Sequence, residues 1–157
     1  MLKKYSSLIF KWLIDWRYLP FKAQVWLFGT GTRAVEVMSL AALIALLILF
    51  VFEPKAIAEI PVYRKFNMIS PTVWIASLSF AAAGIGSTIN AKIYVLQVVN
   101  GGFLIFAGLI FMLVGAAFIT VYPPFSLSMF IFPSLAILCT LAGNNKIRIV
   151  KEGELKQ

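Results

Sequence analysis

The sequence has no histidine and a single cysteine, Cys139. One thiol cannot form an intrachain disulfide, and it cannot supply a metal site with the usual number of ligands. Histidine is also the side chain that most often activates a nucleophile or transfers a proton near neutral pH. We therefore predict no catalytic residue, no metal site and no cofactor, and we expect Cys139 to be a small packing residue.

Charged side chains are missing from the interiors of four long apolar stretches. These stretches are Ala34–Phe52, Pro71–Ile89, Gly102–Thr120 and Pro124–Leu141. As helices rising 1.5 Å per residue, each can cross a hydrocarbon core of about 30 Å. Charged residues inside a membrane usually mark an ion path or a proton relay, so their absence argues against such a path. Glu36 lies in the first turn of the first stretch, where the helix dipole favours a carboxylate, and we interpret it as a helix-terminus residue.

Long polar segments are also missing. Hydrophobic residues make up 61% of the chain, and its mean hydropathy is +0.93, whereas soluble domains contain about 45–50% apolar residues. Each segment between the apolar stretches is about twenty residues or fewer, too short for a core of its own. The sequence therefore predicts an all-α membrane protein in which residues 34–141 form a four-helix transmembrane bundle.

Positive charge is concentrated at the two ends of the chain. The net charge is +8, and eleven of the fourteen basic residues lie before the first stretch, after the fourth, or between the second and third. The positive-inside rule then places both termini in the cytoplasm. We expect a multi-pass protein of the bacterial inner membrane, with cytoplasmic segments 1–33 and 142–157.

The N-terminal segment has the spacing of an amphipathic helix. Over Lys3–Leu19, large apolar and aromatic side chains recur at steps of three and four residues. This helix is too short and too charged to span, so we predict that it lies in the inner interface, bound to anionic lipid headgroups. Basic residues mixed with aromatics also occur in nucleic-acid-binding proteins, but the helical spacing favours lipid. The predicted membrane-interface residues are Lys3, Lys4, Lys11, Trp12, Trp16, Arg17 and Trp26.

A possible processing site follows the first apolar stretch. Ala56–Ile57–Ala58 meets the small-residue rule for signal peptidase. A signal peptide has a short basic region and a shorter apolar core than Ala34–Phe52. We therefore expect the first span to be retained.

The second apolar stretch is rich in small and hydroxyl side chains. Ser79 and Ala83 are one turn apart, as are Ala83 and Ser87, and Gly86 adds to the pattern. Small residues allow helix backbones to approach closely in lipid, which gives no hydrophobic reason for helices to associate. We predict that these four residues pack against other helices and that this helix lies in the middle of the bundle.

The third stretch carries glycines at seven-residue intervals. Gly101, Gly108 and Gly115 leave one stripe of the helix bare, which favours close contact with a neighbouring helix. Leu104, Phe111 and Phe118 form a bulky stripe on the opposite side. A bare stripe could also line a pore, although glycine offers no polar side chain to water. In the fourth stretch Pro133 removes a backbone hydrogen bond, which predicts a kink.

Two classes of function fit these features. We favour a small non-enzymatic membrane protein that acts through helix packing with another membrane component: an accessory subunit, an assembly factor, or a superinfection-exclusion protein of the type that prophages place in the inner membrane. The alternative is an oligomeric pore, such as a holin-like protein or a small channel. Short length, basic ends and charge-free spans are compatible with both classes.

Overall fold

The computed structural model describes residues 31–52, 66, 68–119 and 127–154. The predicted amphipathic helix at Lys3–Leu19 lies outside the described residues. All seven predicted membrane-interface residues lie outside them too: Lys3, Lys4, Lys11, Trp12, Trp16, Arg17 and Trp26.

The described part of the chain is helical and contains no strand. Its helices are α3 (Arg33–Phe52), α5 (Pro71–Thr88), α6 (Tyr94–Ile119) and α7 (Leu127–Glu154). Of these, α3, α6 and α7 are long and apolar enough to cross a membrane. The predicted fold class is therefore confirmed for this part as an all-helical, multi-pass membrane protein with three candidate spans.

Helix α5 is the shortest of the four. Pro71 occupies its first turn, and the carbonyl of Ser70 accepts hydrogen bonds from the backbone N–H groups of Val73 at 2.9 Å and Trp74 at 3.2 Å. Proline, serine, threonine and glycine along its whole length lower its mean hydropathy, and α5 is not among the three candidate spans.

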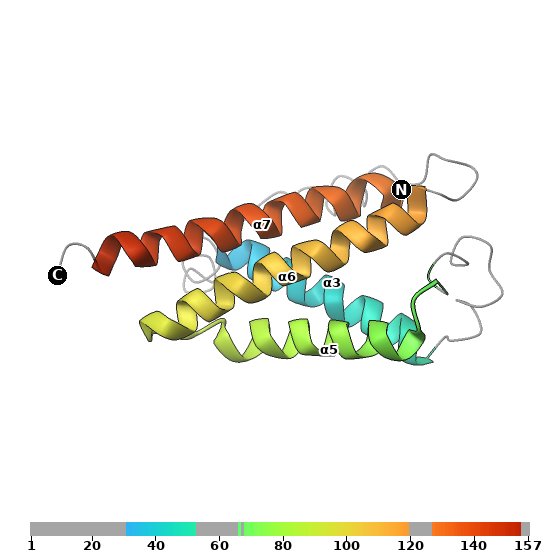
Figure 1. Cartoon of the computed structure of the whole chain (residues 1–157), viewed down its shortest axis with the longest axis horizontal. Coiled ribbons are helices and arrows are strands. Elements are labelled where there is room, and N and C mark those ends of the chain that lie inside the picture. The colour runs from blue at the N-terminus through green and yellow to red at the C-terminus, as the bar shows by residue number, and fades with distance from the viewer. Residues whose placement is uncertain (1–30, 53–65, 67, 120–126, 155–157) are drawn as a thin grey trace, which may run out of the picture. The chain divides into compact units, whose positions relative to one another are not determined.

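Consecutive helices run in opposite directions (Figure 1). The start of α3, the end of α5, the start of α6 and the later part of α7 share one end of the helical unit, because side chains from these four places contact one another. The backbone of α6 lies close to that of α7 and, over fewer residues, to that of α5. In contrast, α3 approaches the others mainly through its side chains.

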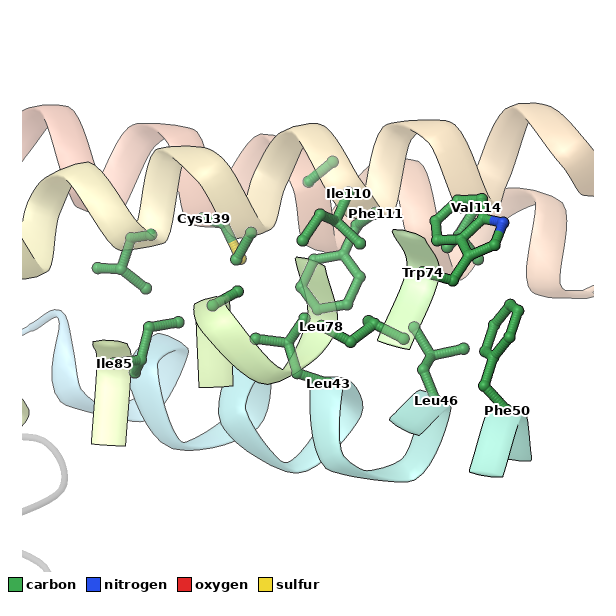
Figure 2. Close-up of a cluster of buried hydrophobic side chains, with 14 of the residues drawn as sticks. Leu43, Leu46, Phe50, Trp74, Leu78, Ile85, Ile110, Phe111, Val114 and Cys139 are labelled. Atoms are coloured by element: carbon green, nitrogen blue, oxygen red, sulfur yellow. The ribbon is translucent and has the colours of Figure 1, made fainter. Parts of the chain in front are cut away.

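Apolar side chains from all four helices fill the interior (Figure 2). Leu43 of α3, Leu78 of α5 and Phe111 of α6 are each 0% exposed. The bulky stripe of α6 is buried as well as its glycine stripe, so α6 is covered on both sides. Helix α6, the third apolar stretch, thus lies between two neighbours, whereas the small residues of the second stretch had predicted that position for α5.

Two helices extend beyond the expected limits of their apolar stretches. Helix α6 begins at Tyr94, before the expected start at Gly102. Helix α7 continues beyond Leu141 to Glu154, so most of the expected tail is helical.

Candidate functional site: a polar layer across four helices

One buried or nearly buried polar side chain from each helix meets at the shared end of the unit. We call these four residues, Glu36, Thr88, Asn100 and Lys146, the polar layer. Glu36 and Asn100 are 0% exposed and Thr88 is 5% exposed. The side chain of Lys146 is 15% exposed. Polar groups at this level of burial are stable only when they bind to one another or to the backbone.

The ammonium group of Lys146 joins three of the helices. Its Nζ atom lies 2.6 Å from Oε1 of Glu36 on α3 and 2.8 Å from Oδ1 of Asn100 on α6. The two opposite charges compensate each other inside the protein, which is the usual condition for burying a charge. The contact also shows that the first turn of α3 and the later turns of α7 lie side by side.

Asn100 continues the hydrogen bonds to the fourth helix. Its Nδ2 atom donates to Oγ1 of Thr88 at 2.8 Å, and Thr88 donates in turn to the carbonyl of Gly84 at 2.6 Å. Each hydrogen bond therefore points the same way, from the ammonium group to the backbone of α5. Hydrogen bonds in such a chain polarise and strengthen one another.

A second polar contact links α3 to α7 deeper in the bundle, one turn from the polar layer on α3 and two turns from it on α7. Oγ of Ser39 lies 2.9 Å from Sγ of Cys139, and the hydroxyl donates to the carbonyl of Val35 at 2.5 Å. Because this bond uses the serine hydrogen, the thiol is the donor to Ser39. Cys139 is fully buried, so it is a packing residue that also carries an interhelical hydrogen bond.

These contacts are suited to holding helices in register. The ammonium, amide and hydroxyl groups of the polar layer bind partners on other helices. Breaking a buried ion pair on one side is costly, so the pair favours one arrangement of α3 and α7. In the described ranges, no three His, Cys, Asp or Glu side chains lie close enough to hold a metal ion.

The glycine stripe of α6 lies against α7. A Cβ atom on Gly108 would come within 2.7 Å of Oγ1 of Thr140 and 3.0 Å of the carbonyl oxygen of Ala136. A Cβ atom on Gly115 would meet the ring of Pro133 at 2.8 Å. A Cβ atom on Gly101 would come within 2.9 Å of the carbonyl oxygen of Gly143. All three glycines thus lie where α7 leaves no room for a side chain. Gly143 was not among the predicted packing residues.

The predicted small residues of α5 are placed differently. Ala83, Gly86 and Ser87 are exposed, and Ser79 is half-buried. The tight contact of α5 is made by Gly84 instead, where an added Cβ would overlap the ring of Phe103. Ala83 and Ser87 are therefore directed out of the helical unit, whereas a Cβ atom on Gly86 would lie 4.0 Å from the methyl carbons of Leu40 on α3.

Pro133 lies within the continuous helix α7, with its ring against Gly115.

Aromatic rings gather at the end of the helical unit opposite the polar layer. The ring of Phe66 is 5.5 Å from those of both Trp74 and Phe118, and the ring of Phe118 is stacked on that of Phe132 at 5.7 Å. We call this group, with Phe50, the aromatic layer. The indole N–H of Trp74 donates to the carbonyl of Phe66 at 3.1 Å, which satisfies its polar atom.

The sequence pattern did not reveal the polar layer as a unit. Glu36 was predicted to be a helix-terminus residue and Lys146 to lie in a tail. The available signal was charge: Glu36 and Lys146 are opposite charges placed on the same predicted face of the membrane, and Asn100 lies at the same level.

Comparisons with protein-family models, curated proteins and solved structures found no match to this chain.

Proposed function

We propose that this chain is a non-enzymatic protein of the bacterial inner membrane that acts through its outer surface, by packing against another membrane component. The chain would serve this component as an accessory subunit or an assembly factor. Alternatively, it would block the component, as a superinfection-exclusion protein of the phage type does. The protein needs no cofactor in this role.

The filled interior is the observation that carries this proposal. Apolar side chains such as Leu104 and Phe111 occupy the space between the helices, and the polar layer closes one end. Conversely, large apolar side chains on all four helices are exposed: Ile48, Phe80, Met112 and Leu138 are examples. A bundle with a filled interior and an apolar outer surface is suited to contact lipid or protein around it rather than to bind a solute inside it.

The ion pair supports a four-span arrangement with both termini in the cytoplasm. If α3, α6 and α7 each cross the membrane and α5 does not, the start of α3 and the end of α7 lie on opposite sides. The contact between Glu36 and Lys146 holds these two ends close together, which supports an even number of crossings between them. In that arrangement α5 crosses as well, and the positive-inside rule favours the orientation with most of the positive charge in the cytoplasm.

The alternative function is a pore, and one observation favours it. The exposed face of α5 carries Ala83, Gly86 and Ser87, a weakly apolar surface that could line a path between several copies. Such a path would run between chains, because the interior of each chain is filled.

Graded expression with a dye that reports membrane potential separates the two functions. A packing protein leaves the potential unchanged at all expression levels and copurifies with a partner after cross-linking. A pore depolarises cells with a defined onset, and that result would refute the proposal. A variant with Gly86→Leu and Ser87→Leu would then test whether the exposed face of α5 lines the path.

A further inference from the structure

An open apolar groove lies between α3 and α7 and has a volume of about 460 Å³. Its lining includes Met38 and Ala42 of α3 and, from α7, Phe130, Ile131, Ser134 and Leu138. Both helices are candidate spans, so the groove faces the membrane interior.

The groove is short and its lining is apolar. It follows α7 from Phe130 to Leu138, about 12 Å at 1.5 Å per residue, and its described lining residues are apolar apart from Ser134. A hydrocarbon chain matches this apolar lining.

The same face of α7 becomes polar and cationic towards its C-terminal end. Residues seven apart lie nearly above one another on a helix. Ile131 and Leu138 are thus in line with Asn145, and Ser134 is in line with Arg148; both polar residues are exposed. An amide and a guanidinium are donors that bind phosphate oxygens well.

The spacing matches the depth of one leaflet. Arg148 is ten residues beyond Leu138, about 15 Å along the helix, and half of a hydrocarbon core of about 30 Å is also about 15 Å. Arg148 lies in the last turn of the candidate span Ser128–Ile149, where the headgroup region begins. Basic sites between helices on the cytoplasmic side are suited to acidic lipid headgroups.

We propose that the α3–α7 groove binds one acyl chain of an anionic phospholipid of the inner leaflet, with the phosphate at Asn145 and Arg148. This inference rests on the membrane-spanning arrangement of the proposed function and names one specific lipid partner. Chain and headgroup are held at two points of the same helix face, so this lipid exchanges more slowly than its neighbours.

Native mass spectrometry of the full chain tests the proposal. The protein is purified in detergent and mixed with equal amounts of phosphatidylglycerol and phosphatidylcholine that carry the same acyl chains. We expect one retained lipid per chain, with phosphatidylglycerol favoured about fivefold, the effect of one basic side chain near an anionic headgroup. Arg148→Ala should bring the ratio of retained phosphatidylglycerol to phosphatidylcholine close to one. Lys92→Ala, which removes an exposed cation from the turn between α5 and α6, should leave this ratio unchanged.

Variants that fill the groove with a larger side chain provide a second test of lipid binding. Ser134→Trp should abolish lipid retention, whereas Leu113→Trp, which adds the same side chain to an exposed position on α6, should not. Ala42→Phe replaces Ser134→Trp if that variant does not fold, as judged by its elution in gel filtration. Equal retention of the two lipids, retention in the filled variants, or displacement of lipid by a second copy of the chain would overturn the proposal. None of these results changes the expected membrane potential, so the proposed function is tested separately.

Discussion

At the scale of single residues, the unusual feature is a buried carboxylate and a nearly buried ammonium group in an otherwise apolar chain. Glu36 and Lys146 are 110 positions apart in the sequence and 2.6 Å apart in space. Their contact depends on the fold, because each would be costly inside the membrane without the other. The free energy of unfolding should therefore fall more when one of the two residues is replaced than when both are replaced by uncharged residues.

Replacing one partner should be worse than replacing both. Lys146→Met leaves the carboxylate of Glu36 buried without its ammonium group and should lower the free energy of unfolding by about 3–5 kcal/mol. The double variant Glu36→Gln with Lys146→Met should regain most of this loss. Denaturant titration in detergent micelles measures the difference. Lys92→Met, which removes an exposed cation, is the control and should have little effect; an equal loss in the single and double variants would refute the role of the pair.

At the scale of helices, the glycines of α6 give a matched comparison on one element. Gly108→Ala places a Cβ against Thr140 and the backbone of Ala136, whereas Gly102→Ala meets nothing within 4 Å. Alanine favours a helix over glycine by about 1 kcal/mol, so Gly102→Ala should be neutral or stabilising. Gly108→Ala should lower the melting temperature of the folded protein in detergent, because α6 and α7 have to separate. Similar shifts for both variants would show that α7 does not pack closely on this stripe.

Hydropathy predicted the existence of these helices better than their ends. The heptad spacing of Gly101, Gly108 and Gly115 predicted one common stripe, and in the structure these glycines lie against α7. The end of α7 could not be read in the same way, because Gly143, Asn144 and Asn145 are typical of a helix end. In the structure Gly143 packs against Gly101 and Lys146 binds Glu36 and Asn100. These contacts between distant residues outweigh the local propensity, and one sequence does not reveal them.

The exposed face of α5 marks a different limit of the sequence. Small-residue spacing indicates that a helix can be approached closely, but it does not say which side faces a neighbour in the same chain. Ala83, Gly86 and Ser87 fit the pattern and are exposed, whereas Gly84 makes the close contact with Phe103. The choice depends on the rotation of α5, which is set by the buried side chains of Trp74, Leu78 and Ile85.

At the scale of the whole molecule, two layers close the bundle at its ends. The polar layer and the aromatic layer are separated by fourteen positions on α3, from Glu36 to Phe50, or about 21 Å. This spacing fits within a hydrocarbon core of about 30 Å, with the apolar core between the layers. We propose that four helices, α5 included, cross the membrane as one closed bundle.

Labelling of single cysteines in intact cells tests this claim most directly. With Cys139→Ala as background, a membrane-impermeant maleimide is applied to cells that carry Ser70→Cys, Ala91→Cys or Glu154→Cys. We predict that Ser70→Cys, at the start of α5, reacts from outside. Ala91→Cys, just after α5, and Glu154→Cys, at the end of α7, should react only after the cells are opened. Reaction of Ser70→Cys and Ala91→Cys from the same side would show that α5 does not cross the membrane and would contradict the account.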